Sequence, residues 1–167
     1  MSILRDIVAT YRRPRHVIAG LIAAGPREDR ALAVLMGASL LIFVSQWPRA
    51  ARQAHLDPAA PLEARLTGAL LASLFLLPLA AYLVALLSHG LARAAGGRGT
   101  AFGARIALFW ALMAVSPLML GHGLLAGMVG PGAAGVMVTG AIVFGMFLWI
   151  WLNGLRAAQD AGSGQSV

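Results

Sequence analysis

Charged residues divide the chain into long apolar segments separated by short polar ones. Between Ile106 and Leu155 the sequence contains no Arg, Lys, Asp or Glu. A bilayer core of about 30 Å is crossed by about 20 helical residues, so this segment is long enough to cross twice. Glycines and a proline in 127–135 interrupt it and favour a turn between two helices. The pattern therefore predicts a protein that spans a membrane several times.

Four apolar segments are long enough to be transmembrane helices. Their predicted ranges are 31–47, 66–87, 102–127 and 133–152. Trp47 ends the first, where indole rings collect at the membrane interface, and Pro48 follows it. Asn153 and Gly154 are typical of a C-terminal cap, so we expect the last helix to end there. The polar segment 49–65 predicts a loop that contains a short amphipathic turn.

Residues inside the spans predict how the helices bend and pack. Pro78 in the second span and Pro117 in the third are expected to kink their helices. Polar residues in the spans are expected to hydrogen-bond to other helices or to their own backbone; they are Ser39, Ser45, Gln46, Ser73, Tyr82, Ser116 and Thr139. Small residues that allow close helix packing are Gly37, Ala38, Gly68, Ala69, Ala72, Gly140 and Gly145.

The N-terminal segment differs from the spans because arginines interrupt its apolar residues. Apolar residues in 2–24 recur at three- and four-residue spacing, and Pro14 divides the segment into two helices. Basic amphipathic helices of this kind lie in the lipid headgroup region with their arginines on phosphates. The alternative is a helix pair packed on the protein's own cytoplasmic face. The side chains expected to bind lipid headgroups are Arg12, Arg13, Arg15, Arg93, Arg98 and Arg105.

These elements define an all-α integral membrane protein in which a basic amphipathic interfacial helix pair precedes four transmembrane helices. Residues 1–30 form the cytoplasmic membrane-surface segment, 31–155 the transmembrane domain and 156–167 a flexible C-terminal tail. Four spans place two sets of arginines on opposite sides. One set is Arg5, Arg12, Arg13, Arg15, Arg27, Arg30, Arg93, Arg98, Arg105 and Arg156; the other is Arg49, Arg52 and Arg65. The larger set predicts that both termini are cytoplasmic.

Composition adds the expected compartment and partners. All 13 basic residues are Arg, and together with the abundant Ala and Gly they indicate a GC-rich bacterium, so we expect the bacterial inner membrane. A net charge of +7 would favour nucleic acid in a soluble protein, but beside apolar spans it favours anionic membrane lipids. The sequence has no Cys, which excludes disulfides, thiolate metal sites and cysteine nucleophiles.

The spans contain few groups that could catalyse a reaction or couple transport to protons. All six acidic residues lie outside them, which argues against a proton-coupled carrier. Topology assigns His16 and His89 to the cytoplasmic side and His55 and His122 to the other, and neither pair has a carboxylate companion. The serines in the spans lack a neighbouring base. We therefore expect no metal, no cofactor and no enzymatic activity.

The order of parts resembles the bacterial branch of the Yip (Ypt/Rab-interacting protein) family of small polytopic membrane proteins. The likeness rests on a basic lead with an Arg-Pro step at 13–18, a glycine loop at 96–102 and a third span that contains Ala107-Leu108-Phe109-Trp110-Ala111 followed by Ser116-Pro117. The resemblance implies a polytopic membrane protein without a catalytic signature. The acidic-aromatic Gly-Pro motif of the eukaryotic members, which are linked to small GTPases, has no counterpart here.

Three functions remain open at this stage. The first is a non-enzymatic accessory or scaffold protein of a larger membrane complex or a homo-oligomer, because the spans expose apolar residues to lipid or to a partner. The methionines that suggest this exposure are Met36, Met113, Met119, Met128, Met137 and Met146. The second is a small-molecule or lipid permease that works as a homo-oligomer. The third is a lipid-binding, membrane-shaping protein.

Overall fold

The computed structural model describes residues 3–163, and within them every regular element is a helix. Residues 1–2 and 164–167 lie outside the described part. The elements are α1 (Ile3–Thr10), α2 (Pro14–Ala23), α3 (Glu28–Leu56), α4 (Leu62–Leu71), η1 (Ala72–Leu76), α5 (Leu77–Ala94), α6 (Ala101–Val129) and α7 (Ala134–Ser163). The helices α4, η1 and α5 follow one another without a loop, so we refer to them together as the 62–94 helix.

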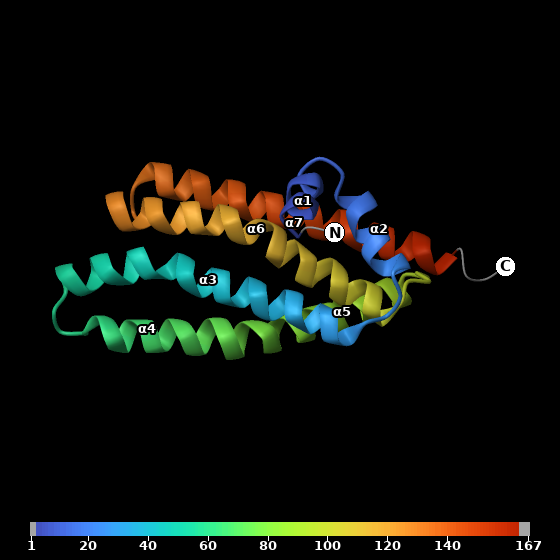
Figure 1. The fold of residues 1–167 in the computed structure, drawn as a ribbon, viewed down its shortest axis with the longest axis horizontal. Helices are drawn as coiled ribbons and strands as arrows, with labels where there is room; N and C mark the ends of the chain where they lie inside the picture. Colours follow the sequence, from blue (N-terminus) through green and yellow to red (C-terminus); the bar gives the residue numbers. More distant parts are fainter. Residues whose placement is uncertain (1–2, 164–167) are drawn as a thin grey trace.

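Four of these helices are long and apolar enough to cross a membrane, as the sequence predicts. They are α3, the 62–94 helix, α6 and α7. They lie roughly side by side along the long axis of the molecule (Figure 1). The start of α3, the 95–100 loop and the last turns of α7 lie at one end, which we call the basic end. The loops 57–61 and 130–133 lie at the opposite end, which we call the turn end.

Helix α6 is the centre of the bundle and makes its most extensive contacts with α3 and α7. The contact with α3 depends on two glycines. A Cβ atom on Gly123 would lie 1.8 Å from the backbone oxygen of Ser45, and one on Gly127 would lie 2.5 Å from Cβ of Pro48. Glycines four residues apart on one helix face let the two backbones approach, and larger residues at these positions would force the helices apart.

The 62–94 helix lies at the side of the bundle, against α3 and α6. Its inner face is narrow, with Ala81 and Ala85 of α5 buried and no residue of α4 buried. A π-helical turn, η1, lies just before Pro78. Proline lacks a backbone donor and its ring clashes with the preceding turn, and a widened turn relieves both problems. The predicted distortion at Pro78 is therefore present as η1.

Pro117 disturbs α6 in a different way. It cannot donate to the carbonyl of Met113, but the Ser116 hydroxyl donates to that oxygen at 2.9 Å. The side chain thus satisfies the acceptor that the proline leaves without its helical partner. Figure 1 shows α6 changing direction near its middle, in agreement with the kink expected from the sequence.

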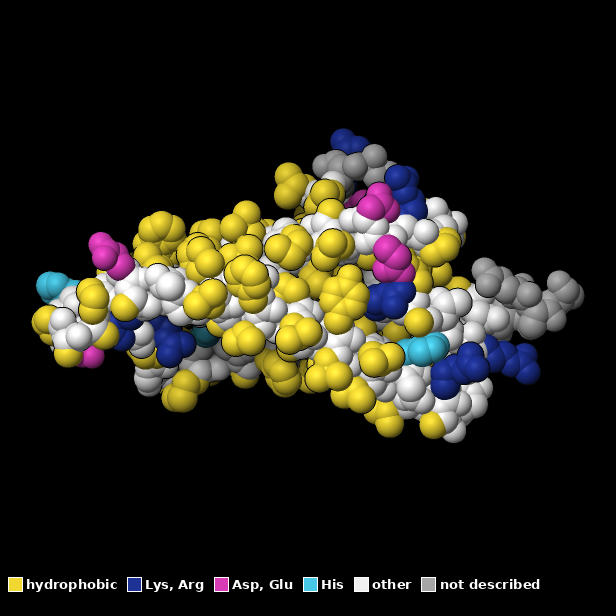
Figure 2. Space-filling model, turned by 90° about the horizontal axis from the view of Figure 1, so that it is seen from below, with side chains coloured by type: hydrophobic (Ala, Val, Ile, Leu, Met, Phe, Trp, Pro, Cys, Tyr) yellow, Lys and Arg dark blue, Asp and Glu magenta, His cyan; other side chains and the backbone are white. Residues whose placement is uncertain are grey.

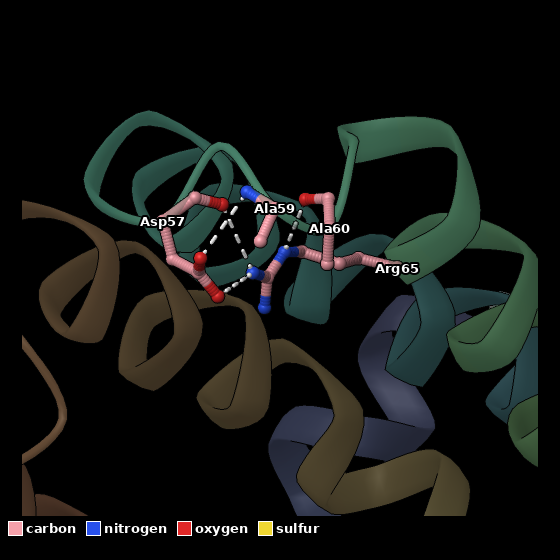
Figure 3. Close-up of polar contacts among 4 residues, drawn as sticks. All are labelled: Asp57, Ala59, Ala60 and Arg65. Atoms are coloured by element: carbon pink, nitrogen blue, oxygen red, sulfur yellow. Dashed lines mark hydrogen bonds and ion pairs between the residues drawn. The ribbon is translucent and has the colours of Figure 1, made fainter.

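Both loops at the turn end are held by arginines. Arg65 donates from Nη2 to Oδ2 of Asp57 at 2.8 Å and from Nε to the carbonyl of Ala60 at 3.0 Å (Figure 3). Asp57 also accepts a hydrogen bond from the backbone N–H of Ala59, so one ion pair orders the whole turn. At the other loop, Arg52 donates to the carbonyl of Met128 at 3.0 Å and so caps the C-terminus of α6.

Two predicted helix ends are corrected by the structure. Helix α3 does not end at Trp47 and Pro48; it continues to Leu56 with Pro48 inside it, so the loop is only 57–61. Helix α7 continues past Asn153 and Gly154 to Ser163, and residues 156–163 are therefore helix rather than flexible tail. The rest of the predicted tail, 164–167, lies outside the described residues.

The structural reason is visible at the predicted cap of α7. Asn153 donates to the carbonyl of Trp149 at 2.7 Å, one turn back along the same helix. Gly154 is buried, and a Cβ atom there would lie 2.7 Å from Cδ1 of Ile18 and 3.0 Å from Cβ of Ala107. The glycine allows three helices to approach one another, so it serves packing and not helix termination.

Two short helices, α1 and α2, precede the spans and pack on the bundle. Ile7 and Thr10 of α1 and Ile18 and Leu21 of α2 are buried, and α2 contacts α7. Trp110 Nε1 donates to Thr10 Oγ1 at 2.9 Å. This arrangement matches the alternative in which the pair packs on the protein itself, although the contact lies on the side of the bundle (Figure 1).

Candidate functional site

The largest cavity opens between α3 and the α6–α7 hairpin near the turn end. Its volume is about 540 Å³, and it is lined from three helices and one loop. The polar lining residues are Ser45, Gln46 and Arg49 of α3 and His122 of α6. Pro131 and several apolar side chains, among them Ile42, Met119 and Met137, complete the wall. A polar cavity between apolar spans is the first candidate for a site.

Hydrogen bonds hold the polar groups of this cavity in place. His122 Nδ1 lies 3.0 Å from Thr139 Oγ1, and the Thr139 hydroxyl also lies 2.9 Å from the carbonyl of Gly135. Gln46 Nε2 donates to Ser73 Oγ at 2.9 Å, which connects α3 to η1. The predicted roles of these polar residues are thereby confirmed: Gln46 bonds between helices, and Ser45, like Thr139, bonds back to its own helix.

A second cavity lies between α5 and α6 toward the basic end. It has a volume of about 350 Å³ and is lined by Leu79, Tyr82, Leu83, Ala85, Leu86, His89, Ala101 and Arg105. Arg105 pairs with Glu28 at the start of α3, and its side chain is 28% exposed. His89 Nδ1 and Arg105 Nε are both buried and have no hydrogen-bond partner among the described residues. Polar atoms buried without partners are rare in folded proteins.

The structure separates the six predicted headgroup arginines into two groups. Arg12 and Arg13 are exposed beside the helix pair, and Arg15 forms an ion pair with Asp160 of α7 at 3.1 Å. The second group, Arg93, Arg98 and Arg105, gathers at the end of α5 and the start of α6. Among the described residues, Arg93 and Arg98 are exposed and have no ion-pair partner, whereas Arg105 has Glu28.

Sequence reasoning missed the contact that anchors the N-terminal helix pair. The Tyr11 hydroxyl donates to the carbonyl of Ala114 at 2.5 Å, beside the Trp110–Thr10 bond. Burial raises the pKa of Tyr11 above its ordinary 10.0, so the phenol stays protonated and able to donate at neutral pH. The alternation of polar and apolar residues in 2–24 carries no sign of this contact, because its partner lies about one hundred residues away.

The exposure of the methionines divides them. Met36, Met128 and Met137 are exposed, as expected for residues that face lipid or a partner, but Met113 is buried in the core against Gly37.

Two of the histidines line cavities: His122 lines the larger cavity and His89 the smaller one. Across the described part of the chain, no group of three or more His, Asp or Glu side chains is placed to hold a metal ion.

Comparison of the chain with protein-family models, with curated proteins and with solved structures finds no match. The class of the molecule therefore rests on the helices themselves: an all-helical chain with four candidate membrane spans. The cavities and the exposed helix faces are the features that bear on its function.

Proposed function

We propose that this chain is a non-enzymatic, Yip-like accessory or scaffold protein of a membrane complex in the bacterial inner membrane, with both termini in the cytoplasm. The observation that carries the proposal is the outer face of the 62–94 helix. Leu76, Leu83, Leu87 and Leu91 form one stripe along it and are 55–73% exposed. Only 17% of the most apolar part of this helix is buried, although it is the most apolar of the four.

The stripe suits a partner helix as well as lipid. Its leucines recur at helical spacing on the side away from Ala81 and Ala85, so a second helix would pack along an uninterrupted ridge. Among the described residues outside the 62–94 helix itself, only α3 and α6 make extensive contacts with α5 and η1. Figure 2 shows hydrophobic side chains covering the middle of the molecule on this view.

Gentle extraction of tagged protein from native membranes, followed by mass spectrometry, tests the proposal. We expect a stoichiometric membrane partner that is lost when Leu76, Leu87 and Leu91 are changed to Ala. The matched control changes Met137, Val138 and Ile142 on the exposed face of α7, and it should keep the partner. A monomer that carries only lipid in both preparations would contradict the proposal.

A second candidate is a small-molecule or lipid permease that works as a homo-oligomer, and the polar cavity favours it. Gln46, Arg49 and His122 line a space at the edge of the spans where a small polar molecule would find donors. Flux through reconstituted vesicles that disappears in His122→Leu and persists in His55→Leu, an exposed histidine, would support this candidate. Vesicles without flux of ions, metabolites or labelled lipid would remove it.

A further inference from the structure

The groove between α5 and α6 complements an amphipathic ligand in shape and chemistry. Its α5 wall runs from Leu79 to His89, a distance of about 15 Å along the helix at about 1.5 Å per residue. The wall is apolar along Leu79, Leu83 and Leu86, and the polar residues His89 and Arg105 lie together at the end near the basic loop. A length of about 15 Å equals half of a bilayer core of about 30 Å, which is one leaflet.

We propose that this groove binds one anionic glycerophospholipid, with its phosphate at Arg105 and His89 and an acyl chain along α5. The inference goes beyond the accessory role proposed above and does not depend on it. Arg105 uses one end of its guanidinium for Glu28, and its Nε has no partner among the described residues. His89 Nδ1 is likewise buried without a hydrogen-bond partner among the described residues. Phosphate oxygens accept strong charge-assisted hydrogen bonds from arginine, and from histidine when the ring nitrogen carries a proton.

The charge around the polar end favours an anion. Arg93 in the last turn of α5 and Arg98 in the following loop are exposed and have no ion pair among the described residues. The carboxylates at the basic end, Glu28, Asp29 and Asp160, are already paired with Arg105, Arg27 and Arg15. Figure 2 shows Arg and His side chains near one end of this face and hydrophobic side chains over its middle, an arrangement that a headgroup and its chain would cover.

The apolar part of the groove distinguishes a lipid from free phosphate. A soluble anion would use only the end with Arg105 and would leave Leu79, Leu83 and Leu86 uncovered. The ring of Tyr82 packs edge-on against Phe109, with the ring centroids 5.0 Å apart, and this contact fixes the floor of the groove beside the leucines. The occupant therefore needs both an anionic head and a long apolar chain.

The test uses the full chain reconstituted in vesicles with equal parts of phosphatidylglycerol and phosphatidylcholine. Native mass spectrometry after gentle extraction then measures which lipid stays bound. We expect one phosphatidylglycerol per chain, and retention that falls about tenfold or more in Arg105→Gln, because charge-assisted bonds of this kind are worth at least that factor. Arg156→Gln is the control for the loss of one arginine charge, since Arg156 is exposed on α7 and does not line the groove, and it should retain the lipid.

Two further arms keep the result unambiguous. Leu79→Trp fills the apolar part of the groove at a position that is 70% exposed and lies outside the outer stripe, and it should also lose the lipid. Inorganic phosphate added at high concentration should not displace phosphatidylglycerol; displacement would show that the site binds free phosphate instead. Equal retention of the two lipids by the unchanged protein, or equal retention by the Arg105→Gln and Arg156→Gln variants, would overturn the proposal.

Discussion

Helix α6 and the 62–94 helix are both long and apolar, but they hold opposite positions in the bundle. The most apolar part of α6 has a mean hydropathy of 1.7 and is 50% buried, whereas that of the 62–94 helix has 2.5 and is 17% buried. The other two spans follow the same rule, because α3 with 1.7 is 39% buried and α7 with 2.0 is 11% buried. The two spans of higher mean hydropathy are the two less enclosed ones, although α7 is less buried than the more hydrophobic 62–94 helix.

The physical reason is the absence of a hydrophobic driving force between helices in lipid. Lipid tails are as apolar as leucine, so a leucine-rich helix gains little by moving inward. A helix becomes central when small residues let its backbone approach another, as Gly123 and Gly127 do against α3. Hydropathy therefore identifies the spans of this chain, whereas glycine positions identify its centre.

The largest test of this comparison is Gly123→Ala in α6 against Gly68→Ala in the 62–94 helix. A Cβ atom on Gly123 would lie 1.8 Å from Ser45 O, whereas Gly68 has no atom of a neighbouring element within 4 Å. We expect Gly123→Ala to lower the free energy of unfolding by about 3 kcal/mol or more. Gly68→Ala should leave it unchanged or raise it by about 0.5–1 kcal/mol, because Ala favours helix over Gly. Denaturation of the purified protein in mixed detergent micelles measures both; equal effects would contradict the comparison.

The second test compares a buried and an exposed aliphatic side chain. Ile18 of α2 is fully buried against Gly154 and Ala107, whereas Leu87 of α5 is 56% exposed. We expect Ile18→Ala to cost about 2–5 kcal/mol, mainly by releasing the helix pair, and Leu87→Ala to cost less than about 0.5 kcal/mol. Arg12 is exposed in the folded chain, but trypsin cleaves a locally unfolded backbone, so faster tryptic cleavage there reports release of the helices. Slow cleavage in both variants would show that Ile18 does not anchor the pair.

The third test concerns the hydroxyl that attaches α1 to the centre. Tyr11→Phe removes its bond to the carbonyl of Ala114, and we expect a loss of about 1 kcal/mol. The raised pKa of Tyr11 gives the sign of the pH dependence: the protonated phenol is favoured in the folded state, so its contribution is complete below pH 10.0 and is lost as pH rises through the raised value.

The matching measurement follows ionisation of Tyr11 by ultraviolet absorbance. Tyr82→Phe leaves Tyr11 as the only tyrosine, because the sequence contains two. The midpoint should lie above 10.0 in the folded protein and return to about 10 in denaturant. A midpoint that is the same in both states would show that the ring is not enclosed.

The smallest effect is expected where the 62–94 helix meets α3 through one polar bond. Gln46 donates to Ser73 in η1, and a double-mutant cycle of Gln46→Leu and Ser73→Ala should give a coupling of about 0.6 kcal/mol. Ser88→Ala is the control, since its hydroxyl bonds only to the carbonyl of Val84 in its own helix. If the coupling energy between Gln46 and Ser88 were as large as that between Gln46 and Ser73, the Gln46–Ser73 bond would not be what holds the 62–94 helix against α3.

The sequence predicts the four spans and both proline distortions because charge, hydropathy and proline act locally. It does not predict where α3 and α7 end. Pro48 is tolerated inside α3, and Gly154 is used for close packing of α7 on Ile18 and Ala107. Whether a glycine caps a helix or admits a neighbour depends on a partner that is distant in sequence.

For the candidate sites too, the sequence identifies single residues but not which residues come together. Arg105 is identifiable from its position beside a span, but its neighbour His89 comes from the preceding helix and only the fold places the two on one groove. The polar cavity likewise combines Gln46 of α3 with His122 of α6. Neither pairing follows from local spacing, because each joins residues of different helices.

The anchoring of the N-terminal helix pair has a consequence for biosynthesis. Thr10 and Tyr11 bond to Trp110 and Ala114, which follow them in the sequence by 100 and 103 residues. At about 5–20 residues per second, a ribosome needs about 5–20 s to synthesise the residues between them. Helices α1 and α2 are thus synthesised well before the surface of α6 on which they dock, and during that interval their apolar face is uncovered.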